Sequence, residues 1–309
     1  MRLYLASVTD YRLWGGGKME LFLAGLTALF HYNGNNIILG SSMPTIPLHT
    51  HTHTHTHTGD ETIFSRRTRS EKRIAERERE RGWQDLSVLE SYYYARKNPF
   101  FERLYYKGVD LLLDSGAFTF MMSGAKIDWD KYVEEYAAFI NKYQIKKFFE
   151  LDIDSIVGLQ EVERLRAKLE TLTGRKCIPV WHKSRGLDYW KKMCEEYHYI
   201  AIGGIVSKEI PRGKIASIAK SLINMAHAKG VKVHLLGYTP CDILAENIPL
   251  DSADSTTWIV GNRSGTIYKF DGRKICKYNA PKGKRLKSSE VARHNFYEWA
   301  KYQKFLKYK

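Results

Sequence analysis

The segment LLLDSGAF at residues 111–118 places Asp114 directly after an apolar run. A carboxylate at the end of a buried strand is costly unless it has a partner or a chemical task. Asp114 is therefore a candidate acid/base group. The alternative is a turn-forming aspartate, because Asp before Ser-Gly favours a turn. This segment alone leaves both interpretations open.

A second segment, FFELDIDS at residues 148–155, carries Asp152 and Asp154 two residues apart. If the strand continues through both, their side chains lie on the same side. A carboxylate can accept two parallel hydrogen bonds, which suits the N1–H and exocyclic amine of guanine. The competing interpretation is a loop aspartate that caps the helix expected from Leu159. A third segment, LDSADSTTW at residues 250–258, adds Asp251 and Asp254 near the last expected strand end.

The elements that must position these carboxylates alternate along the chain. Apolar runs predict strands at Val109–Leu113, Lys147–Ile153, Cys177–Trp181, Tyr199–Ile202 and Val231–Leu236. Amphipathic spacing predicts helices at Trp129–Tyr143, Leu159–Leu172, Leu187–Tyr197 and Ile215–Lys229. Strand followed by helix, repeated, indicates an α/β fold with a parallel sheet and crossover connections.

Every predicted strand ends in small or polar residues. These ends are Asp114-Ser115-Gly116, Asp152-Ile153-Asp154, His182, Gly203-Gly204 and Gly237-Tyr238. A (β/α)8 barrel of the TIM type builds its active site at such carboxyl ends. A doubly wound sheet produces the same pattern. On the order of the elements we predict the barrel.

Composition points to a basic, compact protein. The 309 residues include 49 Lys and Arg against 34 Asp and Glu, a net charge of +15. Such a field attracts polyanions, nucleic acid above all, although basicity can also serve solubility alone. The hydrophobic share of 43% and the charged share of 27% are ordinary for a globular domain.

The four cysteines are scattered without a C-x-C or C-x-x-C pair, so no disulfide framework or thiolate zinc site is predicted. A reducing cytoplasm fits this pattern best. The start of the chain lacks the features of a secretory signal, and the apolar run Leu21–Phe30 is too short to span a bilayer. We expect a soluble, cytoplasmic protein.

Two regions stand apart within a predicted insertion at about 45–82. The repeat HTHTHTHTHT at His49–Thr58 would align five imidazoles if extended, so it is either a divalent metal site or a low-complexity surface segment. The stretch Ser65–Gly82 mixes Arg with Glu, as in a solvated helix with i,i+4 pairs. We place the main domain at 1–264 and a basic C-terminal extension at 265–309.

The C-terminal extension is predicted to hold a hairpin and a helix. Thr266–Phe270 and Arg273–Tyr278 flank Asp271-Gly272, a favoured hairpin turn. A basic segment, Lys282–Lys287, precedes a helix from Ser289 to about Tyr308. Its lysines suit phosphate contact, whereas its aromatics equally suit an amphipathic packing helix.

Four segments resemble the tRNA-guanine transglycosylase family, in the family's order. LLLDSGAF resembles its D-S-G-G-[FY]-Q strand end, AIGGIV at residues 201–206 its G-G-L turn, LLGYTPCDIL at residues 235–244 its M-G-x-G-x-P-x-D-L segment, and LDSADST its nucleophile region. The resemblance covers roughly residues 111–258. It implies a (β/α)8 barrel that exchanges guanine for a 7-deazaguanine through a covalent aspartyl intermediate, without any cofactor.

Carried over by position, the resemblance assigns a role to each matching residue. Asp254 corresponds to the nucleophile, Asp251 is a neighbour in an alternative register, and Asp114 is the general acid/base. The remaining positions are implied to bind the base; they are Ser115, Phe118 by stacking, Asp152 at the guanine edge, His182 near the purine oxygen, Gly203, Gly204 and Tyr238. His182 is alternatively a structural residue.

Two departures from the family bear on the substrate. The C-x-C-x-x-C…H zinc pattern is absent, and Ala117 and Thr119 replace the motif's second Gly and its Gln. A short chain with the barrel motifs but without zinc ligands resembles the phage and bacterial DNA-guanine transglycosylases of the DpdA type. We therefore expect DNA and a free 7-deazaguanine base, such as the 7-cyano form, as partners. The alternatives are tRNA as substrate, a non-catalytic nucleic-acid-binding partner subunit, and an unrelated barrel hydrolase.

Overall fold

The computed structural model describes residues 1–6, 86–98, 101, 109–116, 127–205, 209–259, 265–279, 286 and 288–309. Several sequence predictions fall outside these ranges. They are the His-Thr repeat, the Arg/Glu-rich stretch, the apolar run 21–30, Phe118, and all but one residue of the basic segment 282–287. The predicted domain boundary at 264–265 adjoins undescribed residues and stays a prediction.

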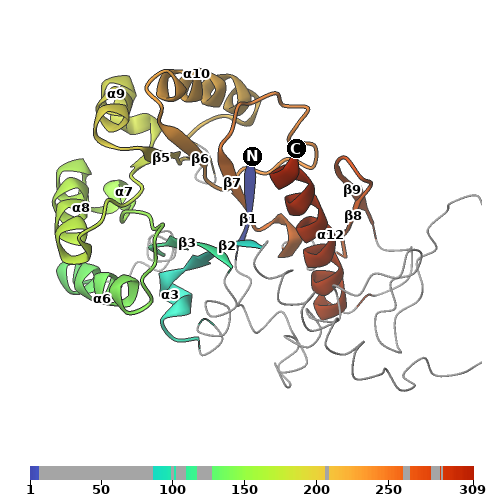
Figure 1. Ribbon diagram of the computed structural model, residues 1–309, viewed down its shortest axis with the longest axis horizontal. Helices are drawn as coiled ribbons and strands as arrows, with labels where there is room; N and C mark the ends of the chain where they lie inside the picture. Colours follow the sequence, from blue (N-terminus) through green and yellow to red (C-terminus); the bar gives the residue numbers. More distant parts are fainter. Residues whose placement is uncertain are drawn as a thin grey trace, which may run out of the picture.

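A curled sheet of seven parallel strands forms the centre of the molecule (Figure 1). The strands run in the order β3-β2-β1-β7-β6-β5-β4, and every pairing is parallel. Their bounds are β1 Arg2–Ala6, β2 Ser87–Ser91, β3 Asp110–Asp114, β4 Val180–Trp181, β5 Tyr199–Ile202, β6 Lys232–Leu235 and β7 Ser252–Ser255. Read from β4, the order runs from β4 to β7 and then from β1 to β3, which is the chain order in cyclic form with no change of direction. A doubly wound sheet requires such a reversal, so that alternative is wrong.

The predicted strand Lys147–Ile153 pairs only in its first half. Phe148 and Phe149 form single parallel bridges to Leu113 of β3 and to Ile178, just before β4. The backbone then turns, with the N–H of Ile153 donating to the carbonyl of Leu151, and helix α7 (Asp154–Val157) begins. The strand is therefore shorter than predicted because a helical turn starts at its end.

Helices cover one face of the sheet, and apolar side chains fill the other. The covering helices are α6 Trp129–Lys142, α8 Leu159–Thr173, α9 Gly186–Glu196 and α10 Ile215–His227, each close to its predicted range (Figure 1). Short helical segments are α3 Tyr92–Ala95, η2 Lys183–Arg185 and η3 Arg212–Lys214. Inside the curl, a separate buried cluster includes Tyr4, Leu89, Leu112, Phe149 and Val180. Successive strand residues point alternately to the cluster inside the curl and to the core between the sheet and its helices, because side chains in a strand alternate between its two faces.

The C-terminal residues form the predicted hairpin and helix. Strands β8 (Ile267–Phe270) and β9 (Ile275–Tyr278) pair antiparallel, and α12 spans Ser288–Tyr308. The buried Gln303 of α12 donates to the carbonyls of Leu3 and Ser87 and accepts the N–H of Ser87. These bonds fix α12 across β1 and β2, so the packing interpretation of this helix is confirmed.

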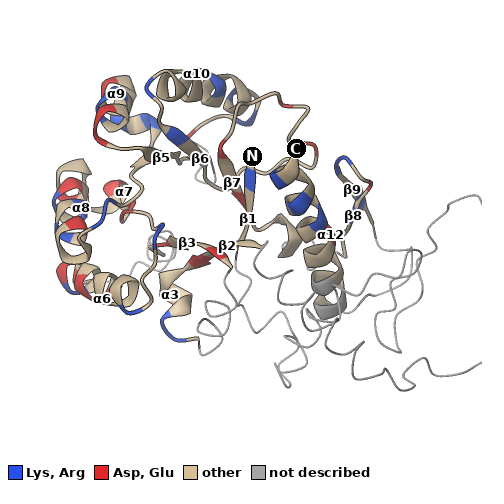
Figure 2. Ribbon diagram, in the orientation of Figure 1, with Lys and Arg blue, Asp and Glu red and all other residues tan. Residues whose placement is uncertain are grey.

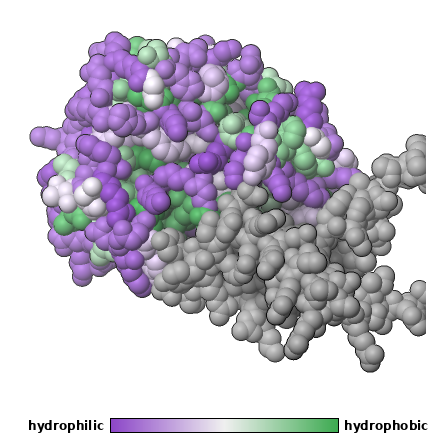
Figure 3. All heavy atoms as spheres, in the orientation of Figure 1, coloured by the Kyte–Doolittle hydropathy of each residue, from purple (hydrophilic) through white to green (hydrophobic). Residues whose placement is uncertain are grey.

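Among the described residues, the face shown in Figure 3 is mostly hydrophilic, with smaller hydrophobic areas between. Within the described ranges, no helix combines the length and apolar character needed to cross a bilayer.

Candidate active site

The carboxyl ends of the strands bring four predicted residues to one edge of the sheet. Asp114 is the last residue of β3, and Asp254 is the third residue of β7. Asp152 follows the bridging segment, and His182 follows β4. The negative charges of Asp152 and Asp254 both raise the pKa of Asp114, so the three carboxylates share one site.

Asp114 combines a turn-forming hydrogen bond with a raised pKa. Its Oδ2 accepts the backbone N–H of Gly116 at 2.9 Å, as the turn interpretation requires. Burial, followed by the charge of Asp152 and then that of Asp254, raises the pKa of Asp114 to about 7 against the hydrogen bond from Gly116. A carboxyl group with a pKa near neutrality can both donate and accept a proton. The turn and acid/base interpretations are therefore compatible.

The turn after β3 depends on a glycine. Gly116 has a φ of +82°, and a Cβ there would lie 2.5 Å from Cβ of Tyr93 and 2.9 Å from Oγ of Ser91. Only glycine combines this conformation with this close approach. The Gly116 N–H is thereby aimed at Asp114.

Asp254 is buried, and two groups orient its carboxylate. Its Oδ1 lies 2.6 Å from the backbone nitrogen of Gly237 and 3.3 Å from Nε2 of His234. Gly237 follows β6, the neighbour of β7, so parallel pairing brings its N–H to this oxygen. Within the described part of the chain both contacts end on Oδ1. Among the described residues, no hydrogen bond to Oδ2 of Asp254 is found.

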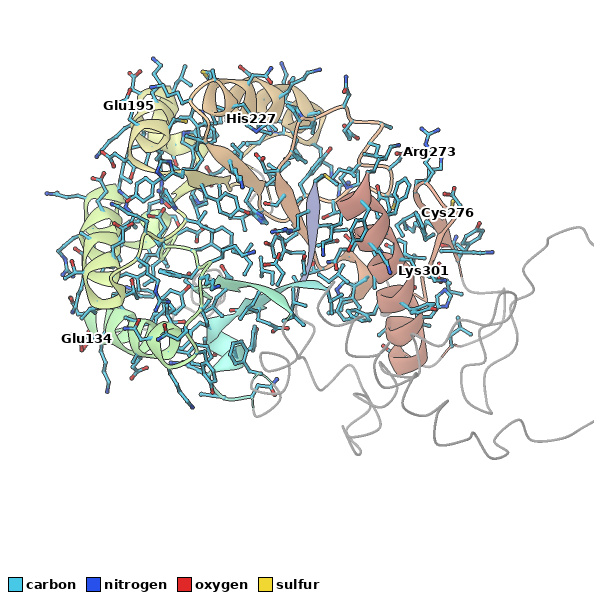
Figure 4. All side chains as sticks on the ribbon, viewed as in Figure 1. Glu134, Glu195, His227, Arg273, Cys276 and Lys301 are labelled. Carbon is cyan, nitrogen blue, oxygen red and sulfur yellow. The ribbon has the colours of Figure 1, made fainter. Side chains whose placement is uncertain are left out.

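Asp251 lies at the other end of β7. Its Oδ2 accepts the N–H of Val233 at 2.8 Å and lies 2.8 Å from Nε2 of His227. Figure 4 shows His227 on α10, at the periphery of the molecule. The strand register thus places Asp254, and not Asp251, at the carboxyl end. The structure does not bring Asp251 to the other candidates, and the prediction that it binds the substrate is not retained.

His182 bridges two carboxylates. Its Nε2 lies 3.2 Å from Oδ2 of Asp152, and its Nδ1 lies 3.1 Å from Oε1 of Glu209. Burial alone would lower the pKa of His182, but the hydrogen bond to Asp152 and the charges of Asp152 and Asp154 outweigh it and raise the pKa to about 9. At neutral pH the ring is a cation that donates from both nitrogens. His182 therefore holds Asp152, in addition to standing near the predicted base site.

The double glycine after β5 makes room for this histidine. A Cβ on Gly203 would lie 2.8 Å from Cγ1 of Val180 and 3.0 Å from Nε2 of His182. Gly204 has a φ of +74°, and a Cβ there would press on Glu209 at 3.3 Å. These two glycines are explained by the histidine and the glutamate packed against them.

Asp152 and Asp154 share one side, but not for the predicted reason. The strand ends before them, and Asp154 lies in the first turn of α7. It does not cap α8, whose N-cap residue is Gly158. Oδ2 of Asp154 instead accepts Nε of Arg185 at 3.2 Å, and its Oδ1 lies 4.0 Å from Nε2 of His182. The same-side placement is therefore confirmed, whereas the continued strand and the capping of α8 are wrong, and Asp154 binds Arg185.

A buried ion cluster supports the turn that carries His182. Glu150, fully buried, accepts Nη1 of Arg185 at 2.8 Å, Nη1 of Arg166 at 3.1 Å and the N–H of Val180 at 2.8 Å. Arg185 ends the η2 turn that follows His182. The cluster thus ties the bridging segment, β4 and α8 together beneath the site.

Glu150→Gln is expected to destabilise the protein by about 3–5 kcal/mol, because it removes the fully buried carboxylate that two buried guanidinium groups share. The free energy of unfolding from urea titration measures this. Glu163→Gln is the matched control, since partly exposed Glu163 also contacts Arg166, at 3.5 Å, as well as Lys192. Its expected cost is below about 1 kcal/mol. Equal costs for the two variants would contradict the assigned role of Glu150.

The other predicted base-binding residues have mixed outcomes. Ser115 is buried directly after Asp114, and its carbonyl accepts the hydroxyl of Tyr132 at 2.6 Å. Tyr238 follows Gly237 at the carboxyl end of β6 and is half-buried. Phe118 lies outside the described residues, so its stacking role stays a prediction.

Two site residues were missed by sequence reasoning. His234 is fully buried in β6 and contacts Asp254, and Glu209 contacts His182. A signal existed for His234, because KVHLL interrupts an apolar strand with one imidazole. None existed for Glu209, which a loop brings to the site.

The described residues hold no group of three or more His, Cys, Asp or Glu side chains arranged to bind a metal ion. Comparison with protein-family models found no match to this chain, and neither did comparison with curated protein sequences. The function of the chain is therefore inferred from the geometry and chemistry of the site.

Proposed function

We propose that this protein is a guanine transglycosylase that exchanges a guanine in DNA for a 7-deazaguanine base. The observation that carries the proposal is the presence of two carboxylates in unlike environments at the carboxyl-terminal edge of the sheet. Asp114 has a pKa of about 7, whereas Asp254 is buried with Oδ1 held by Gly237. Carboxylates in such different environments suit the separate roles of acid/base and nucleophile.

The fold that suits this function is a closed (β/α)8 barrel. The sheet supplies seven of the eight strands of such a barrel. The bridging segment at Phe148 and Phe149 is proposed as the eighth strand, between β3 and β4. Its backbone hydrogen bonds to Leu113 and Ile178 support this proposal. Closure would place every carboxyl strand end around one cavity mouth.

Asp152 is proposed to read the guanine edge. A base within a duplex hides this edge, so the target nucleotide must be flipped out. Oδ2 of Asp152 is occupied by His182, but each carboxylate oxygen has two lone pairs. The carboxylate can therefore still accept N1–H and the exocyclic amine of the base. His182 then acts by holding Asp152 in place. The purine oxygen is proposed to bind to the backbone near Gly204.

The exchange is proposed to proceed by two displacements at C1′. Oδ2 of Asp254 attacks C1′, the C1′–N9 bond breaks, and guanine leaves with the proton of Asp114. A 7-deazaguanine enters, loses its N9 proton to Asp114 and attacks C1′, which releases the Asp254 carboxylate. Two inversions give net retention, and the proton that Asp114 spends in the first step is returned in the second.

DNA is preferred to tRNA as the substrate because the chain lacks the cysteine pattern of the zinc subdomain that the tRNA enzymes use. The charge of +15 suits either nucleic acid. Lysines lie along α12, including the exposed Lys304, and the exposed Lys309 follows the end of the helix (Figure 2). Their phosphate contact would make binding weaken steeply with salt.

Incubation of the purified chain with radiolabelled guanine and either duplex DNA or unmodified tRNA tests the proposal. We expect label in DNA, and chase of that label by excess 7-cyano-7-deazaguanine. Label in tRNA alone would overturn the DNA assignment while keeping the chemistry. Release of free base without replacement would indicate a hydrolase, and no reaction with either polymer would favour a binding subunit.

A further inference from the structure

A chain of hydrogen-bonding groups runs beneath Asp254 through the interior of the curled sheet. Nε2 of His234 lies 3.3 Å from Oδ1 of Asp254, and its Nδ1 lies 2.8 Å from Oγ of Ser252. Oγ of Ser252 is in turn 2.5 Å from the hydroxyl of Tyr199. Three adjacent parallel strands, β5, β6 and β7, supply this chain below the carboxyl ends.

Two aromatic rings pack against the histidine ring, and both of its nitrogens have polar contacts. It is fully buried, Tyr4 meets it edge-on at 5.9 Å between centroids, and Phe149 packs at 5.3 Å. Ser252 holds the nitrogen opposite Asp254. An imidazole with one nitrogen held in this way presents the other in a single orientation.

We propose that His234 is a positioning residue that donates its Nε2–H to Oδ1 of Asp254, with Ser252 and Tyr199 holding the ring. The inference rests on the proposed function, because it concerns the orientation of Asp254 as the nucleophile. An ionised Asp254 offers only acceptors, so a stable contact at Nε2 requires the proton there. The Gly237 N–H ends on the same oxygen, and the pair locks the carboxylate with Oδ2 toward the substrate.

The two donors have unequal effects on the two displacements. In the second, the C1′–Oδ2 bond breaks and its electron pair returns to the carboxylate, so negative charge grows on Oδ1. Donors aimed at an oxygen where charge develops stabilise that transition state. In the first displacement the charge decreases, and the same donors give no such advantage. His234 is therefore expected to speed breakdown of the glycosyl-enzyme more than its formation.

Single-turnover experiments with a labelled oligonucleotide separate the two steps. His234→Phe is expected to slow breakdown of the covalent adduct by roughly 10- to 100-fold, the effect of one lost hydrogen bond to a charged group. The adduct then accumulates, as seen on denaturing gels. His234→Gln, which restores an N–H donor, should recover most of the breakdown rate. Equal loss in both steps, without rescue by Gln, would overturn the proposal.

A readout independent of activity keeps this inference distinct from the function itself. Nitrogen-15 NMR of the imidazole in the wild-type chain is expected to place a proton on Nε2 of His234. A single proton on Nδ1 would overturn the donor role even if exchange activity is present. Conversely, a proton on Nε2 in a chain without exchange activity would retain the hydrogen bond and overturn the proposed function.

Discussion

Replacing Asp254 with Asn is expected to abolish base exchange, with a loss on the order of 10⁴-fold or more. The amide keeps the size of the side chain and still offers an oxygen to the N–H of Gly237, which now donates at 2.6 Å. It cannot act as a nucleophile at C1′, so no glycosyl-enzyme forms. Incorporation of labelled guanine measures the loss, and a denaturing gel with labelled DNA shows whether the adduct is absent.

Asp251→Asn is the matched control for this variant. It makes the same chemical change three residues earlier, at the opposite end of β7, where the side chain contacts Val233 and His227. Because Asn can still accept the Val233 N–H, we expect activity within a few-fold of the wild type. Loss of exchange in Asp251→Asn together with retention in Asp254→Asn would refute the register and the nucleophile at once.

The order of strands and helices was predictable because each element carries its own period. Strand β5 has the predicted bounds, Tyr199–Ile202. Its residues are buried on both faces of the sheet, and the resulting apolar run was visible in the sequence. β1 and β2 were missed, because RLYLA and SVLES are short and mix apolar with polar residues. Their identity as strands depends on pairing with β7 and β3, which no local signal encodes.

A site residue was predictable where a single sequence motif contains both the strand end and the candidate group. Asp114, which is followed closely by the turn residue Gly116, is such a case. The register of Asp254 against Asp251 could not be read from LDSADSTTW, because it is set by the partners of β7. The His182–Glu209 contact joins residues 27 apart across an intervening strand. Such tertiary pairs leave no trace in spacing along the chain.

Replacing Asp114 with Asn is expected to reduce exchange by about 10²- to 10⁴-fold while stabilising the fold above neutral pH. The pKa of Asp114 rises from 3.8 to about 7 on folding. Between these values the folded state binds a proton that the unfolded state has lost, so this group makes the free energy of unfolding fall as pH rises. Asn removes that loss, which amounts to about 4 kcal/mol at most above pH 7.

Urea unfolding of both proteins at several pH values between 4 and 8 measures this difference. We expect Asp114→Asn and the wild type to have similar stability near pH 4, and the variant to gain about 1.4 kcal/mol per pH unit until the difference levels off near pH 7. His182 and the other titrating groups are common to both chains, so their contributions largely cancel in the comparison. A constant difference across this range would show that Asp114 titrates normally, which would remove the basis for its role as the proton donor at neutral pH.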